Sequence, residues 1–222
     1  MQTTILRTGE GNPRLLIFFT GWGTTPEVAD HLLLPNKCDY LTAYDFRTLY
    51  PLPQIPEYEE VYMVGWSMGV WALDQLASLL PAPTKAIAIN GTPIPMNDQY
   101  GIPRDIFIGT LEGLDDTNRE RFNRRMCGGR ALLSVFNTFA QRSTADLRDE
   151  LYGSYLKAKD IDPDASPRLR WTKALTSEKD LIVPPQNQLR YWGKHGVPVT
   201  ELKGCGHYPL QSYSTWEEIL DL

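Results

Sequence analysis

The residues best suited to chemistry in this chain are Gly65-Trp-Ser-Met-Gly69. The apolar run 61–64 precedes them and the helix-like run 70–80 follows, so the serine is expected on a sharp turn from a strand into a helix. Glycines suit both sides of such a turn because a Cβ there would press on the neighbouring strand or helix. Ser67 is therefore the candidate nucleophile, and a purely structural glycine turn is the alternative.

A serine hydroxyl needs a base to become a competent nucleophile, and the chain contains three histidines. His31 falls in a short segment that resembles a helix outside the sheet, and His195 resembles the charged end of a helix. His207 follows the strand-like run 197–202 within Lys203-Gly-Cys-Gly-His-Tyr-Pro209. The two glycines allow the backbone to turn, so that an imidazole reaches back over the sheet edge. We therefore expect His207 to be the base; an exposed loop histidine is the alternative.

The base needs an acidic partner that fixes its tautomer and stabilises the imidazolium. In the chain order serine, acid, histidine, this partner lies between residues 67 and 207. Asp180 follows the strand-like run 169–175, on the carboxyl-end side of the sheet where ligand sites in such folds collect. Glu178 in the same loop is the second candidate. For either residue, an ordinary solvated carboxylate is the alternative.

Acyl transfer also needs two donors aimed at the developing oxyanion. The backbone N–H of Met68, directly after the serine, supplies one. The second is expected from the loop after an early strand, Phe18-Phe-Thr-Gly-Trp-Gly-Thr24, where glycines flank Trp22. We assign it to the backbone N–H of Trp22, and a tight turn with a core tryptophan is the alternative.

The framework for these residues is indicated by apolar runs that alternate with several helix-period segments. The runs, each bounded by turn residues, are 15–19, 41–44, 61–64, 85–89, 169–175 and 197–202. Such alternation predicts an α/β fold in which a mostly parallel, doubly wound sheet is covered by helices on both faces.

The stretch from about 93 to 167 interrupts this alternation. It begins with three prolines and then carries helical patterns around residues 119–126, 131–141 and 144–159. We expect a helical lid inserted in the sheet. A chain of 222 residues with 42% hydrophobic content can bury one substantial core but not two enzyme domains with a linker. A single domain over residues 1–222 is therefore expected.

The composition disfavours several kinds of partner. A formal net charge of -5 argues against nucleic acid as the main partner. The longest apolar runs are far shorter than the roughly 20 residues of a membrane helix, and no charged-then-apolar leader opens the chain. The three cysteines show no metal-binding spacing. We therefore expect a cytoplasmic monomer with no membrane contact, no metal and no cofactor.

The motifs together resemble a known family. Gly65-Trp-Ser-Met-Gly69, Asp180 and His207 in that order, with Gly21-Trp-Gly23 after the first long strand, resemble the α/β-hydrolase family over essentially the whole chain. With Phe122-Asn-Arg-Arg-Met-Cys-Gly-Gly129 and Gly204-Cys-Gly-His-Tyr-Pro209, they resemble the BioG-type pimeloyl-carrier-protein methyl ester esterases of biotin synthesis. This resemblance implies a serine carboxylesterase that hydrolyses pimeloyl-acyl-carrier-protein methyl ester and releases methanol. One departure from many hydrolases is Thr20-Gly21 in place of the frequent His-Gly.

The expected lid has a feature that suits such a carrier. Five arginines fall close together with Glu120 as the only acid among them, and at helical spacing Arg121, Arg124 and Arg125 share one face. That face would attract an acidic carrier protein, and arginine pairs well with the phosphate of a pantetheine arm. A solvated helix face is the alternative.

Two other functions fit the same residues. The triad also suits a general short-chain esterase or an acyl thioesterase, because substrate choice resides in the lid. A non-catalytic acyl-carrier-binding module that kept the fold is an alternative from another class, because a fold does not establish a function.

Overall fold

The computed structural model describes residues 1–6, 9, 11–50 and 52–222, and within them the chain forms a seven-stranded sheet in the order β1-β3-β2-β4-β5-β6-β7. The strands are β1 (Gln2–Leu6), β2 (Arg14–Phe19), β3 (Cys38–Tyr44), β4 (Glu60–Trp66), β5 (Lys85–Ile89), β6 (Lys173–Ser177) and β7 (Val199–Leu202). β1 pairs with β3 in the antiparallel sense, and all other pairs are parallel. The expected mostly parallel sheet is confirmed.

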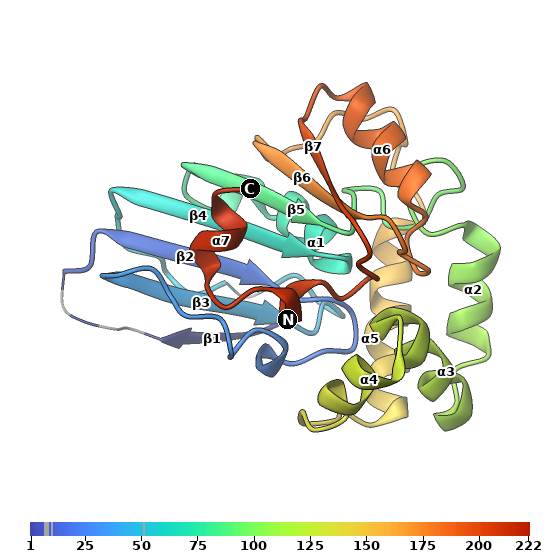
Figure 1. Cartoon of the computed structure of the whole chain (residues 1–222). Helices are drawn as coiled ribbons and strands as arrows, with labels where there is room; N and C mark the ends of the chain where they lie inside the picture. The colour runs from blue at the N-terminus through green and yellow to red at the C-terminus, as the bar shows by residue number, and fades with distance from the viewer. Residues whose placement is uncertain (7–8, 10, 51) are drawn as a thin grey trace.

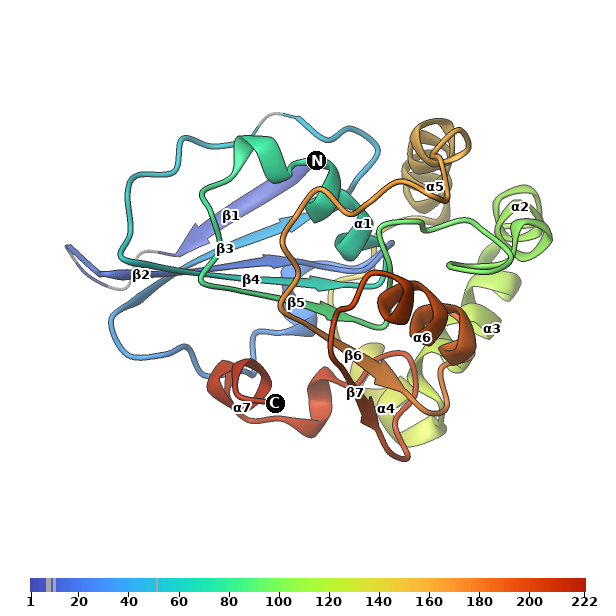
Figure 2. The ribbon, with the colours of Figure 1, turned by 90° about the horizontal axis from the view of Figure 1, so that it is seen from above.

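Helices cover both faces of this sheet, as expected from the apolar character of its strands. Along β2, Leu16 and Phe18 join one core while Ile17 and Phe19 join the other. The core that contains Leu16 and Phe18 is covered by α7 (Trp216–Leu220), and the core that contains Ile17 and Phe19 is covered by α1 (Met68–Gln75) and α6 (Pro185–Lys194). Figure 2 shows α1 and α7 on opposite sides of the sheet. Short 3₁₀ turns lie at η1 (Pro26–Val28), η2 (Ala77–Leu79) and η3 (Leu210–Ser212).

The chain between β5 and β6 forms four helices within the described residues: α2 (Arg104–Glu112), α3 (Asp116–Cys127), α4 (Arg130–Phe136) and α5 (Thr144–Ala158). Figure 1 shows them gathered beyond the carboxyl ends of the central strands. Helix α3 begins after Asp115, whose side chain accepts from the N–H of Asn118, and ends at Gly128 in the left-handed conformation. Three of the helices overlap the expected helical patterns, and α2 was not expected.

Two strands differ from the expectation. The apolar run 169–175 predicted a strand, but β6 begins at Lys173. Leu169 and Trp171 are buried in a loop instead, where the carboxylate of Asp74 accepts from the N–H of Leu169 and from the indole of Trp171. Strand β1 was not predicted, because its sequence contains no apolar run typical of a buried strand. In the structure most of its residues are exposed.

In the part of the chain that the structure describes, no helix combines the length and the apolar character needed to cross a bilayer.

Candidate active site

Ser67 lies on the turn that joins β4 to α1, as the glycine pattern predicts. Its backbone has φ 56° and ψ -122°, a strained region for a residue with a side chain. A Cβ at Gly65 would lie 2.8 Å from the Cα of Val70, and one at Gly69 would overlap backbone oxygens of Phe19 and its neighbour. The close packing of β2, β4 and α1 therefore admits only glycine on either side of the serine without a backbone shift.

Ser67, His207 and Asp180 are in contact at the carboxyl ends of three strands. The Nε2 of His207 lies 2.8 Å from the Oγ of Ser67, and its Nδ1 lies 2.8 Å from the Oδ2 of Asp180. All three residues are buried. In the tautomer that satisfies both contacts, Nδ1–H donates to the carboxylate and Nε2 accepts from the serine hydroxyl. This arrangement can accept the proton of an attacking serine and stabilise the resulting imidazolium.

Asp180, and not Glu178, contacts the histidine. The Oδ1 of Asp180 accepts from the backbone N–H groups of Ile182 at 2.8 Å and Val183 at 3.0 Å. Its Oδ2 accepts from the Nε2 of Gln188 at 2.9 Å as well as from His207. Glu178 lies on the surface, where its carboxylate accepts from the N–H of Gly204.

The other two histidines are held elsewhere. His31 lies in a turn after η1, not in the helix expected there, and its Nε2 donates to the carbonyl of Leu210 at 3.1 Å. His195 directly follows α6, as the sequence predicts, and packs on the ring of Tyr191 with 4.5 Å between the ring centroids. Burial lowers the pKa of His195.

The two proposed oxyanion donors flank the serine. Met68 is the first residue of α1, and the first N–H groups of a helix have no acceptor within it. Trp22 lines the same cavity as Ser67, Met68 and His207. The indole of Trp22 donates to the carbonyl of Leu147 at 3.0 Å and packs edge-on against Phe122. The loop that carries the Trp22 N–H is thus fixed beside Ser67 by contacts with the inserted helices.

The cavity beside Ser67 is mainly apolar and extends under the inserted helices. Its walls include Ile106, Phe107, Phe122, Met126, Leu151 and Ile182, and Arg125 also borders it. A second hollow between α2 and α3 shares Ile106, Phe122 and Arg125 with the first, and it is lined in addition by Arg121 and Arg124. All three arginines are exposed. The arginine face predicted from the sequence therefore lies along the outer hollow, next to the cavity that reaches the serine.

Two polar side chains that contact the segments of His207 and Asp180 were missed by the sequence argument. The Nδ2 of Asn90, directly after β5, donates to the carbonyls of His207 at 3.0 Å and Gly206 at 3.2 Å. Gln188 on α6 donates to Asp180 as described above. The sequence marks Asn90-Gly-Thr-Pro as a turn after a strand, but no local pattern reveals contacts to segments so distant in the chain.

A family model described as pimeloyl-ACP methyl esterase BioG matches residues 1–219. An uncharacterized protein of Haemophilus influenzae is 34% identical over 210 residues, which cover 93% of this chain and 94% of that protein. A malonyl-[acyl-carrier protein] O-methyltransferase of Bacteroides fragilis is 39% identical over 196 residues. The match covers 87% of this chain and 39% of that protein.

Solved structures of related proteins also superpose on this chain. The crystal structure of BioG from Haemophilus influenzae superposes with a TM-score of 0.91 and 32% identity over 100% of both chains. A lipase-esterase related protein from Clostridium acetobutylicum, at 15% identity, gives a TM-score of 0.63 over 99% of this chain and 98% of that one. The fold is that of the α/β-hydrolases.

Proposed function

Because the chain belongs to the BioG family of pimeloyl-ACP methyl esterases, and so to the esterases of biotin synthesis, we propose that it hydrolyses the methyl ester of pimeloyl-acyl-carrier-protein methyl ester with Ser67 as nucleophile. The observation that carries this proposal is the contact of Ser67 with His207, and of His207 with Asp180, beside a mainly apolar cavity that Ser67 and His207 line. The products are the carrier-bound acid and methanol.

The proposed mechanism is acyl transfer through a serine ester. Ser67 Oγ attacks the carbonyl carbon of the methyl ester while the Nε2 of His207 takes its proton. The backbone N–H groups of Trp22 and Met68 stabilise the oxyanion. His207 then returns the proton to the methoxy oxygen as methanol leaves. A water molecule, deprotonated by the same histidine, releases the acid, while Asp180 keeps the imidazole oriented.

The surroundings of the serine support a long acyl chain held by a carrier. The apolar walls suit methylene groups, and the three arginines along the outer hollow suit the phosphate of a pantetheine arm and an acidic protein surface. With the carrier on this rim, only the far end of the acyl chain reaches Ser67. The methyl ester then occupies the oxyanion hole, while the thioester stays outside it.

In this proposal helices α2 to α5 form a lid within a single domain, and the lid determines the choice of substrate. The name of the Bacteroides fragilis relative is consistent with the chemistry. A methyltransferase that acts on a carrier-bound malonyl group makes a carrier-bound methyl ester, and this is the class of ester proposed as the substrate here.

The test is to incubate the purified protein with methyl-pimeloyl carrier protein and follow the intact mass of the carrier. We expect the wild type to remove the mass of one methylene, and Ser67→Ala to remove nothing. Loss of the whole acyl group would contradict the proposal and favour a thioesterase. An unchanged carrier, together with no fluorophosphonate labelling of Ser67 in the folded protein, would favour a non-catalytic acyl-carrier-binding module.

A further inference from the structure

A buried carboxylate on α5 joins the loops that follow two neighbouring strands. Glu150 is 0% exposed. Its Oε2 accepts from the backbone N–H of Gly23 at 3.2 Å, and its Oε1 accepts from the backbone N–H of Phe46 at 3.0 Å. Gly23 lies in the loop after β2, which also carries Trp22, and Phe46 lies in the loop after β3. One side chain of an inserted helix thus holds the two loops that follow β2 and β3.

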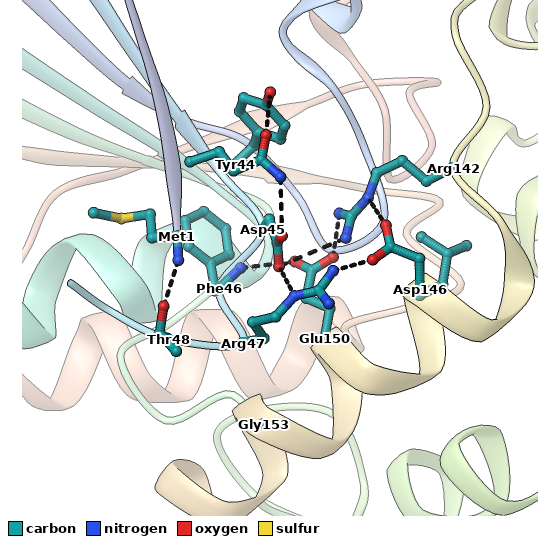
Figure 3. A network of polar contacts seen from close by, with 12 residues as sticks. Met1, Tyr44, Asp45, Phe46, Arg47, Thr48, Arg142, Asp146, Glu150 and Gly153 are labelled. Carbon is teal, nitrogen blue, oxygen red and sulfur yellow. Dashed lines mark hydrogen bonds and ion pairs between the residues drawn. The ribbon is translucent and has the colours of Figure 1, made fainter. Parts of the chain in front are cut away.

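The carboxylate belongs to a cluster of charges, which Figure 3 shows. The Nη1 of Arg142 donates to the Oε2 of Glu150 at 2.5 Å, and its Nε donates to Asp146 at 2.7 Å. Arg47 pairs with Asp45 at 2.7 Å and also with Asp146. Burial raises the pKa of Glu150, and the charge of Arg142 opposes that effect. A well-packed apolar side chain often stabilises a helix contact as well as a buried ion pair does, so the carboxylate suggests a role beyond attaching α5.

Leu147, one turn before Glu150 on α5, also contacts the loop after β2. The carbonyl of Leu147 accepts from the Trp22 indole at 3.0 Å. Gly23 has φ +72°, and a Cβ on it would lie 3.2 Å from the Cδ2 of Leu147, so this loop packs directly against α5. The peptide between Trp22 and Gly23 is therefore bounded by two contacts with α5, one through the indole and one through the Gly23 N–H.

We propose that Glu150 is a positioning residue for the oxyanion hole: by accepting from the Gly23 N–H, it fixes the loop orientation that presents the Trp22 N–H to the cavity beside Ser67. This inference rests on the proposed function, because it requires Trp22 to be an oxyanion donor. Glutamine cannot replace this carboxylate. Glutamine has a single acceptor oxygen, and its NH₂ group is a donor. That donor would face other donors, either the Gly23 N–H and Arg142 or the Phe46 N–H.

The experiment compares Glu150→Gln with Asp146→Asn in the full chain, using a small aryl ester that needs no carrier. Asp146 is the matched control: it lies one turn away on the same helix, and within the described residues its carboxylate contacts only Arg47 and Arg142. We expect Glu150→Gln to lower kcat by about 10- to 100-fold with KM within about twofold, as for a displaced oxyanion donor. Asp146→Asn should keep kcat within about twofold of the wild type.

A boronic acid inhibitor supplies a readout that folding alone does not move, because its serine adduct places an oxygen in the oxyanion hole. Its Ki should rise in Glu150→Gln by about the factor by which kcat/KM falls. Should this variant fail to fold, Glu150→Asp keeps the charge beside Arg142, shortens the reach to Gly23 and should give the same signature. Equal kcat and Ki in the Glu150 and Asp146 variants would overturn the inference. Aryl ester hydrolysis that persists in Ser67→Ala would instead overturn the proposed function.

Discussion

At the scale of single residues, the proposed chemistry depends on how the carboxylate of Asp180 is held. Two backbone N–H groups, the amide of Gln188 and the ring of His207 all donate to it. A carboxylate held in this way fixes the imidazole with its proton on Nδ1, which leaves Nε2 free to accept from the serine.

We predict that Asp180→Asn lowers kcat for a small aryl ester by about 10³- to 10⁴-fold. An amide in this place stabilises the wrong tautomer of the histidine and no longer balances the charge of an imidazolium. Glu178→Gln is the control from the same loop, because its side chain is exposed and contacts Gly204 instead of the histidine. Steady-state kinetics of the two variants measure kcat. A comparable loss of kcat in Glu178→Gln would contradict the assignment of Asp180 as the acidic partner of His207.

The sequence predicted which of these residues meet, but not what holds them. Ser67 has a local motif, and chain order then limits the choice of His207 and Asp180. Asn90, Gln188 and Glu150 have no motif. Asn90 and Glu150 contact backbone groups of segments far away in the chain, and Gln188 contacts the side chain of Asp180 across a turn of the backbone. Their roles follow from packing, which no spacing along the chain encodes.

At the scale of elements, the turn from β4 into α1 depends on close approach of backbone to backbone. A Cβ on Gly69 would overlap the carbonyl oxygens of Phe19 and Thr20, which belong to the end of β2 and the loop after it. Backbone atoms of a central strand cannot move aside as a flexible side chain can, so any side chain here must displace α1 or β2.

We predict that Gly69→Ala lowers the free energy of unfolding by about 3 kcal/mol, the upper range for overpacking in a core, and abolishes esterase activity in the remaining folded protein. Gly193→Ala is the matched control. Gly193 lies near the end of α6, and a Cβ there meets nothing within 4 Å, so alanine should stabilise the protein by about 0.5–1 kcal/mol. Urea unfolding measures both changes. Equal destabilisation by the two substitutions would show that packing at the turn is not the cause.

The elements that the sequence predicted best are the buried strands and the helices with clear caps. β5 was predicted with its bounds, and α5 begins at Thr144 as expected. The run 169–175 was predicted wrongly as a strand because apolar residues also fill a buried loop, provided that its N–H groups find an acceptor such as Asp74. The bounds of β6 therefore depend on a carboxylate in a distant helix.

At the scale of the whole molecule, charge is unevenly distributed. The chain carries a formal net charge of -5, yet Arg121, Arg124 and Arg125 gather along the hollow between α2 and α3. In the proposed docking mode, an acidic carrier would be repelled by the protein as a whole and attracted at this hollow. Long-range forces of this kind orient two proteins before contact and depend on ionic strength.

We predict that reversing all three arginines to glutamate lowers kcat/KM for methyl-pimeloyl carrier protein at least about tenfold, while leaving kcat/KM for a small aryl ester unchanged. The wild-type value for the carrier substrate should also fall as salt rises from about 0.01 M to about 0.1 M, where the Debye length shortens from about 30 Å to about 10 Å. In the triple variant the hollow is acidic and repels the carrier, so its kcat/KM should instead rise as salt screens that repulsion.

Single substitutions give the matched comparison for this surface. Arg125→Glu changes a residue that borders both hollows, whereas Arg170→Glu changes an exposed residue just before β6, at the amino end of the parallel strands and so away from the site. Both carry the same change in net charge. If only the total charge mattered, the two variants would slow carrier hydrolysis equally. If the carrier docks along the hollow between α2 and α3, Arg125→Glu should slow carrier hydrolysis and Arg170→Glu should not. Equal loss on carrier and aryl esters in the triple variant would instead indicate damage to the cavity beside Ser67.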